Sequence, residues 1–193
     1  MAFWTSPLSE PKRQHRFILR LPDLVSTEGG AYSEYLCKSV TKPSYTITET
    51  PHKFLGNTYY FPGTVTWNTC AATIINSIDP DGNALLYEAL VNSGYLKPDV
   101  QRVQVTEGEI TGAMKTVNKR NALQALGSVS IEELTGEGQV VSRWFLKNPF
   151  ITEAKFGDLD YDGDAMLNIE VTFRYDWAEY EIGEGLALIR NLE

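Results

Sequence analysis

The arrangement in this sequence that most resembles a metal site is a run of aspartates at alternate positions. Residues 158–164 (DLDYDGD) place carboxylates two residues apart and a glycine near the end of the run. This pattern is typical of the first half of a calcium-binding EF-hand loop. The last position of such a loop, where a bidentate glutamate belongs, is Ile169. The flanking residues also favour strands over helices. We therefore interpret the run as an acidic turn between strands and expect no metal site.

Side chains for acid–base or nucleophilic chemistry are few. The histidines are His15 and His52, and neither lies in a recognisable catalytic motif. Cys70 beside His52 is the conceivable nucleophile pair, but no local signature supports it. The carboxylate pair Glu132-Glu133 is expected at an exposed strand end. Neither a P-loop nor a G-x-G-x-x-G motif occurs. The sequence predicts a protein that is not an enzyme and binds no cofactor.

The charge distribution argues against nucleic acid as a specific ligand. The chain has 17 Lys and Arg against 25 Asp and Glu, a net charge of −8. Residues 153–193 hold 3 of these basic residues and 11 of the acidic ones, so the remaining 14 and 14 cancel. Binding to phosphates needs clustered Lys and Arg. The acidic excess is compatible with a surface that repels DNA and with simple solubility.

The chain has the composition of a folded protein of about one domain, with 42% hydrophobic and 22% charged residues. No apolar run approaches the ~20 residues that cross a bilayer. The N-terminus lacks the apolar stretch of a signal peptide, so we expect assembly in a cytoplasm. Cys37 and Cys70 are expected to be small buried side chains, although a single disulfide between them stays open.

Strands dominate the predicted elements. Alternating apolar residues predict strands over His15–Leu21 and Tyr35–Val40, and Pro43 ends the second. The clearest alternation is Asn168–Trp177, because side chains of a half-buried strand alternate across the pleat. Its apolar side carries Ile169, Val171, Phe173, Tyr175 and Trp177. Further strands are predicted over 64–75, 100–105, 128–133 and 139–146.

One helix interrupts the strands. Residues 77–81 (SIDPD) have the acceptors and the proline that favour a helix start, and residues 92–94 (NSG) are typical of its end. Residues 111–125 leave helix and strand open. The predicted fold class is mainly β with one inserted helix, as a rolled β-sandwich or small barrel.

A long polar-aromatic hairpin is predicted over Tyr45–Phe61. Gly56-Asn57 is its expected tip, and Pro62-Gly63 is expected to form a second turn. Aromatic residues 59–61 (YYF) lie beside the tip. They are compatible with anchors of a protein interface and with ordinary strand composition.

The order of these elements resembles the tail-tube proteins of contractile (T4-like) bacteriophages. The correspondence covers roughly residues 15–96 and 127–181. It runs from FILRL at 17–21 and YLCKSVTKP at 35–43 through the hairpin to the strand TVTWNTCA and the helix. The acidic turn FGDLDYDGDAML and the closing strand IEVTFRYDWAEYE complete it. The chain departs from the family in its length. We expect a single domain over 1–193, with an arm at 1–14, an enlarged connection at 97–126 and an extension at 182–193.

The resemblance implies a structural subunit of the phage tail-tube type. Copies would form hexameric rings with a continuous inner β-barrel and would stack into a tube. The implied partners are the chain itself and the sheath, baseplate and tail-terminator proteins. DNA would pass through the lumen without specific binding, and no membrane is involved. The implied location is the tail of the virion after assembly in the host cytoplasm. The family pattern also implies an inter-ring contact at the hairpin, formed by Lys53, Phe54, Gly56, Asn57, Tyr59 and Tyr60.

Electrostatics add an expectation about the lumen. A Lys or Arg facing the phosphates would retard moving DNA, so the inner wall is expected to be acidic or neutral. The polar face of Asn168–Trp177 places Glu170 or Asp176 there.

Two alternatives stay open. One is the tube of a contractile injection or type VI secretion system with protein cargo. The other is a calcium-dependent β-sandwich module that uses residues 158–164.

Overall fold

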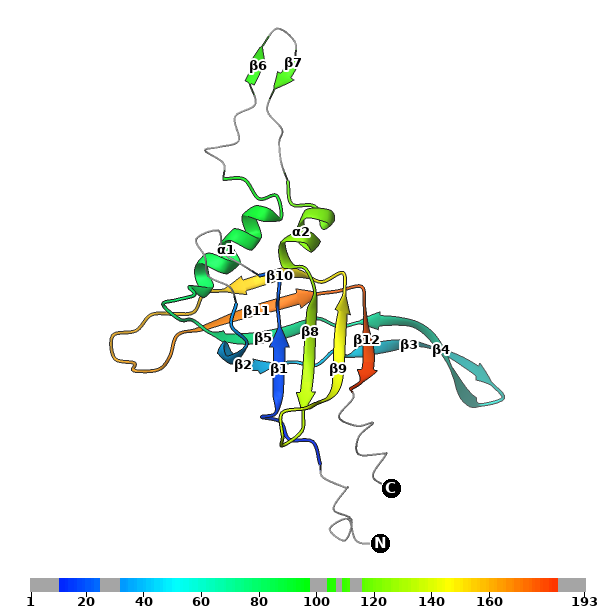
Figure 1. Cartoon of the computed structure of the whole chain (residues 1–193). Coiled ribbons are helices and arrows are strands. Elements are labelled where there is room, and N and C mark those ends of the chain that lie inside the picture. Colours follow the sequence, from blue (N-terminus) through cyan, green and yellow to red (C-terminus); the bar gives the residue numbers. More distant parts are fainter. Residues whose placement is uncertain (1–10, 25–31, 98–103, 107–108, 112–115, 184–193) are drawn as a thin grey trace.

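Two antiparallel sheets, packed face to face with their strands crossing, form the body of the molecule (Figure 1). The computed structural model describes residues 11–24, 32–97, 104–106, 109–111 and 116–183. We call sheet 1 the four strands in the order β1-β8-β9-β12, and sheet 2 the four strands in the order β10-β11-β5-β2. Sheet 1 consists of β1 (Phe17–Arg20), β8 (Val129–Leu134), β9 (Val140–Lys147) and β12 (Trp177–Ile182). Sheet 2 consists of β10 (Phe150–Lys155), β11 (Asn168–Arg174), β5 (Cys70–Ile75) and β2 (Cys37–Val40).

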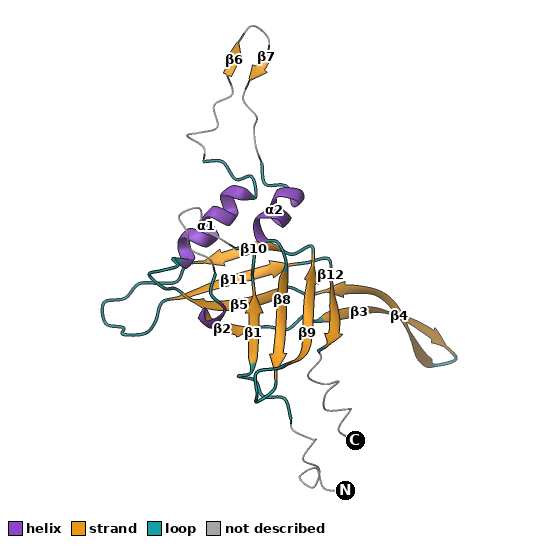
Figure 2. Ribbon diagram, in the orientation of Figure 1, coloured by secondary structure: helices purple, strands orange, loops and turns teal. Residues whose placement is uncertain are grey.

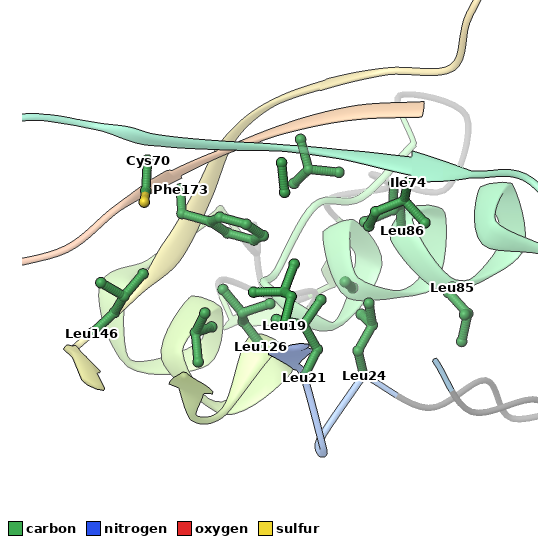
Figure 3. Close-up of a cluster of buried hydrophobic side chains, with 14 of the residues drawn as sticks. Leu19, Leu21, Leu24, Cys70, Ile74, Leu85, Leu86, Leu126, Leu146 and Phe173 are labelled. Carbon is green, nitrogen blue, oxygen red and sulfur yellow. The ribbon is translucent and has the colours of Figure 1, made fainter. Parts of the chain in front are cut away.

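The core lies between the two sheets and under one helix (Figure 3). Leu19 and Ile131 from sheet 1 meet Phe173 from sheet 2, and all three are at most 1% exposed. Helix α1 (Gly82–Asn92) closes one end of this core with Leu85 and Leu86. Burial of such apolar side chains contributes about 1.5–3 kcal/mol each and is the main stabilising term of the fold. The mainly β sandwich predicted from the sequence is confirmed.

The strand with the clearest alternation is confirmed over most of its length. Ile169, Val171 and Phe173 of β11 are buried, and Tyr175 directly after the strand is buried as well. The prediction was wrong at its end, because β11 stops at Arg174 and the chain turns into sheet 1. Trp177 therefore begins β12 and is 44% exposed.

Several other strands match their predicted ranges, namely β1, β2, β8 and β9. The single strand predicted over 64–75 is wrong, because the chain breaks at Asn68-Thr69 between β4 (Asn57–Trp67) and β5. The turn predicted at Pro62-Gly63 is also wrong, since both residues lie within β4. Strand β10 was not predicted. The predicted strand over 100–105 overlaps β6 (Gln104–Thr106), which pairs with β7 (Glu109–Thr111), and residues 98–103 lie outside the described residues.

The predicted helix is confirmed as α1. The side chain of Asp81 caps its start by accepting a hydrogen bond from the Asn83 N–H, at 3.0 Å. A second helix, α2 (Lys119–Leu126), lies in the segment that the sequence left ambiguous, so the expectation of one helix was wrong. Asn118 caps α2 through the Asn121 N–H at 2.9 Å. A short 3-10 turn, Glu34–Leu36, precedes β2.

Figure 2 shows α1 and α2 at the same end of the sandwich. Among the described residues, no helix is long and apolar enough to span a membrane. Residues 1–10 of the predicted arm and 184–193 of the predicted extension lie outside the described residues.

Candidate assembly surfaces

Almost every residue of the hairpin of β3 (Tyr45–Phe54) and β4 (Asn57–Trp67) is exposed. The hairpin continues the β2–β5 pair of sheet 2 and reaches past β12 in the view of Figure 1. The two strands pair from Tyr45 opposite Trp67 to Phe54 opposite Asn57. The tip is one residue earlier than predicted, because Leu55 and Gly56 form the turn with φ of +48° and +82°. Both values fit the tight two-residue turns that suit the twist of a hairpin.

One face of the hairpin base is apolar. Tyr45 opposes Trp67, and Ile47 opposes Val65, so these four side chains lie on one face. The Tyr45 and Trp67 rings meet edge to face at 5.5 Å, and Trp67 lies 6.0 Å from the ring of buried Tyr175. The apolar face of the hairpin is therefore a continuation of the core. Away from Trp67 it is uncovered, since Tyr45, Ile47 and Val65 are each at least half exposed.

The opposite face of the base carries threonines. Thr46 pairs with Thr66, and the Thr48 hydroxyl accepts a hydrogen bond from the Thr64 N–H at 2.9 Å. The register shifts here, between Ile47 and Glu49 on β3, which is the signature of a β-bulge. Gly63 lies within the bulge, where a Cβ would collide with the Thr48 side chain. Bulges bend a strand and increase its twist, so this one sets the direction of the hairpin tip.

The six hairpin residues predicted as an inter-ring contact lie together at the tip. Lys53 pairs with Thr58, and Phe54 pairs with Asn57. Tyr59 is 50% exposed and Tyr60 is 63% exposed. The structure thus brings these residues together on a surface that a partner protein could cover.

The outer edges of sheet 1 are two strands that lack a neighbour on one side. β1 pairs only with β8, and β12 pairs only with β9, in the part of the chain that the structure describes. On the face of sheet 1 that points away from the core, β12 presents Glu179 and Glu181. On the same face, β1 presents Arg20, and alternation continued one residue before the strand places Arg16 there. Unpaired edges of this kind are templates for pairing with another chain.

Between these edges, Glu132 lies buried on the outward face of sheet 1 with an exposure of 1%. The Arg143 Nε donates to its Oε1 at 2.6 Å, and the Arg20 Nε lies 2.9 Å from its Oε2. Arg20 also donates to Glu34 at 2.6 Å. The hydrogen bond to Glu132 raises the pKa of Arg20. The expectation of an exposed strand end was wrong, because the two guanidinium groups cover this carboxylate and make its burial tolerable.

Glu133 points to the core side and is also buried, at 7% exposure. It forms ion pairs with Lys12 and Lys42 and accepts a hydrogen bond from the Ser142 hydroxyl at 2.6 Å. The Ser142 hydroxyl, and then the two lysines, lower the pKa of Tyr180 on β12. This carboxylate therefore ties the segment before β1 and the connection between β2 and β3 to sheet 1. No sequence motif indicated it, since its partners are far apart along the chain.

The two predicted lumen residues do not share a strand. Glu170 lies on β11 in sheet 2, is exposed, and has the Lys155 Nζ at 3.5 Å. Asp176 lies in the connection between β11 and β12. It accepts hydrogen bonds from Lys119 of α2 at 2.7 Å and from Asn148 at 2.8 Å, and these bonds lower the pKa of its carboxyl. The structure therefore gives Asp176 a role in holding α2 against the β9–β10 turn.

The residues that the sequence suggested for metal binding or nucleophilic catalysis do not form a site in the described part of the structure. The acidic run 158–164 forms an exposed loop between β10 and β11. Across the described residues, no three His, Cys, Asp or Glu side chains are placed to hold a metal ion together. Cys37 and Cys70 are both free, and burial raises their pKa values to about 11 and about 12. A nucleophilic thiol needs a lowered pKa, so neither cysteine is activated. His52 lies on the exposed hairpin and not beside buried Cys70.

Comparison with known proteins identifies the fold. No protein-family model matches the chain, and no curated protein sequence matches it. A chain in the structure of the anti-feeding prophage baseplate is similar at 13% identity and a TM-score of 0.58, over 89% of this chain and 96% of that one. A chain in the PVC sheath/tube terminator of an extracellular contractile injection system has 16% identity and a TM-score of 0.56, over 89% and 97%. One in the PVC sheath–tube complex has 18% identity and a TM-score of 0.54, over 89% and 92%. The chain has a tail-tube-like fold.

Proposed function

We propose that this protein is a structural subunit of the tube of a contractile particle, and that it closes a ring by pairing β12 of one copy with β1 of the next. The observation that carries the proposal is the match between the two free edges of sheet 1. The match has two parts, namely strand direction and the charge of the outward face. The tail-tube-like fold found in chains of contractile assemblies supports it.

Strand direction is the first part of the match. Sheet 1 has four strands, and every neighbouring pair in it is antiparallel. β1 and β12 therefore run in opposite directions. When a second copy lies beside the first in the same orientation, its β1 runs antiparallel to β12. A ring of such copies makes a closed barrel in which no edge of sheet 1 stays free.

Charge is the second part. In a continuous sheet, the outward faces of β12 and of the neighbouring β1 coincide. Glu179 and Glu181 of one copy then lie beside Arg16 and Arg20 of the next. Cross-strand pairs of opposite charge each contribute about 0.2–1 kcal/mol. The contribution of one seam is small, but every seam of a closed ring adds it.

This arrangement places sheet 1 at the lumen, as the inner barrel implied by the family resemblance requires. Glu170 lies on sheet 2 and would face away from the lumen. We therefore propose Glu179 and Glu181, rather than Glu170 or Asp176, as the acidic residues of the inner wall. Arg143 and Lys147 share this face of sheet 1 and are paired with Glu132 and Glu179. Such a wall is close to neutral and would hold a moving polyanion weakly.

The particle is proposed to be a phage tail, so that the protein is located in the virion. Hexameric rings would stack inside a sheath, between a baseplate and a terminator. The cargo that passes through the tube would be DNA. The second candidate is the tube of an extracellular contractile injection system with protein cargo. The structures similar to this chain favour it, since they come from the anti-feeding prophage and PVC assemblies. Particles isolated with the sheath and tube intact distinguish the two, because only a phage carries a DNA-filled capsid.

Charge exchange across the seam tests the ring. In sedimentation velocity over a concentration series, the wild type should form rings. Glu181→Lys should weaken them, and adding Arg16→Glu should restore them. Asp164→Lys, in the exposed loop between β10 and β11, is the matched control and should assemble like the wild type. A wild type that stays monomeric at every concentration would overturn the proposal.

Stacking is tested separately at the hairpin tip, which we propose as the inter-ring contact. Replacing residues 52–60 by a two-residue turn should leave rings but stop tube growth in negative-stain micrographs. Tubes of normal length from this variant would show that rings stack without the tip.

A further inference from the structure

The hairpin base and β12 each leave apolar side chains exposed on their core-side faces. Tyr45, Ile47 and Val65 of the hairpin are 57%, 50% and 55% exposed. On the core side of β12, Tyr180 and Ile182 are 48% and 60% exposed. All five side chains lie on core-side faces, and each stays about half exposed or more, although the Tyr180 ring packs at 4.9 Å on the ring of Trp144. Exposed apolar side chains that gather in this way mark an interaction site.

The opposite side of the sandwich offers a matching groove. It opens between β1 and β2, has a volume of ≈ 1010 Å³, and includes Phe17, Val40 and Ile131 in its lining. Its rim is cationic, because Lys12, Arg13, Lys38 and Lys42 also line it. Lys12 and Lys42 both form ion pairs with Glu133, so two ammonium groups share this carboxylate.

The lining also includes the carboxylates of Glu34 and Glu133, but Lys and Arg side chains outnumber them, so a further carboxylate from a partner would be favourable there. Glu49 is the sole carboxylate of β3 and β4. The bulge adds its extra residue to β4, where three residues separate Val65 from Pro62, and only two separate their partners Ile47 and Glu49 on β3. Glu49 therefore lies on the same face of β3 as Ile47 of the apolar base. A hairpin that enters the groove with Tyr45 and Ile47 would bring Glu49 to the lysine rim. Both the apolar surface and the charge are thus complementary.

We propose that the base of the β3–β4 hairpin docks into the β1–β2 groove of the neighbouring copy in the same ring. This inference rests on the proposed function, because pairing of β12 with the next β1 places the hairpin beside that groove. Figure 1 shows the hairpin leaving the body on the β12 side, away from β1. The interface between two copies then has two layers, namely the continuous sheet 1 and the hairpin. Apolar side chains are buried between these layers.

A pair of substitutions on opposite faces of one strand tests the docking. Ile47→Glu places a charge on the apolar face, whereas Thr46→Glu places it on the threonine face one residue away. Both side chains are exposed in the monomer, so both variants should have the melting temperature of the wild-type monomer. Burial of an isoleucine side chain contributes about 1.5–3 kcal/mol, so Ile47→Glu should weaken ring formation at least about tenfold. Thr46→Glu should weaken it by less than about threefold.

Cross-linking identifies the partner surface directly. p-Benzoylphenylalanine at position 45 replaces one aromatic side chain by another. Under light it should give covalent dimers, joined to peptides from 12–18 or 37–42 of a second copy. Rings that form equally well with Ile47→Glu and Thr46→Glu would overturn the docking and leave the tube function standing. Cross-links to any other surface would do the same. If the wild type forms no rings, the proposed function fails and the docking fails with it.

Discussion

Glu132 offers a sharp test of the structure, because a charged side chain in a sheet rarely has an exposure of only 1%. The substitution is Glu132→Gln, which keeps the size of the side chain and removes its charge. Arg20 and Arg143 then lose their shared counter-ion. Removing one partner from a buried ion pair costs about 3–5 kcal/mol when the remaining charge stays buried.

We expect Glu132→Gln to lose less unfolding free energy than that range. The side chains of Arg20 and Arg143 are 42% and 35% exposed, so both guanidinium groups can rehydrate. Glu34 still neutralises Arg20. We expect the free energy of unfolding to fall by about 2–3 kcal/mol. For a chain of this length, that lowers the melting temperature by about 4–12 °C.

The assay is urea unfolding at pH 7, at a concentration where the protein is monomeric. Glu181→Gln is the matched control, because Glu181 lies on the same face opposite Arg143 but is exposed. Its effect should stay within about 0.5 kcal/mol. Equal losses for the two variants would show that the Arg20–Glu132–Arg143 cluster is not formed as described.

Three further predictions follow from the described residues. Val171→Asp should prevent folding, because a buried unpaired carboxylate costs several kcal/mol against a total free energy of unfolding of ~5–15 kcal/mol. Thr172→Asp, on the other face of β11, should destabilise the protein far less. Soluble expression and the melting temperature of the two variants test this difference. Asp176→Asn should lose about 0.5 kcal/mol at pH 7. The bond from Lys119 lowers the pKa of Asp176, so its contribution is present above the unfolded pKa of about 3.9 and is lost as pH falls through the lower folded value. The wild-type advantage should therefore shrink in urea titrations below about pH 4, and an advantage that grows there would contradict the assignment. Calcium should not bind tightly at 158–164, and micromolar affinity in isothermal titration would refute the interpretation of this loop as a turn.

Alternation predicted the strands well where a single strand keeps one face in the core. β11 follows this rule, since its buried residues Ile169, Val171 and Phe173 are spaced two apart, whereas five consecutive residues of β8 are buried. Alternation failed where the chain changes sheet without a glycine or proline. The residues Asn68-Thr69 and Asp176 continue the pattern of their neighbours, yet at both places the chain leaves one sheet.

The assembly surfaces were predictable in part. Turn residues and aromatic side chains located the hairpin, and the structure confirms its pairing and its exposure. The burial of Glu132 and Glu133 was not predictable, because their partners come from residues 12, 20, 42 and 143. Only the three-dimensional fold brings those cations together. Helix α2 was missed because it is only 8 residues long and begins with a polar stretch.

The central claim is that β12 of one copy pairs with β1 of the next. Cryo-electron microscopy of the full-length protein, at a concentration where it sediments as an oligomer, tests this claim most directly. The account predicts rings in which sheet 1 continues from copy to copy around the lumen, with antiparallel hydrogen bonds between β12 and the neighbouring β1. Rings in which these two edges stay unpaired, or in which sheet 2 faces the lumen, would contradict it.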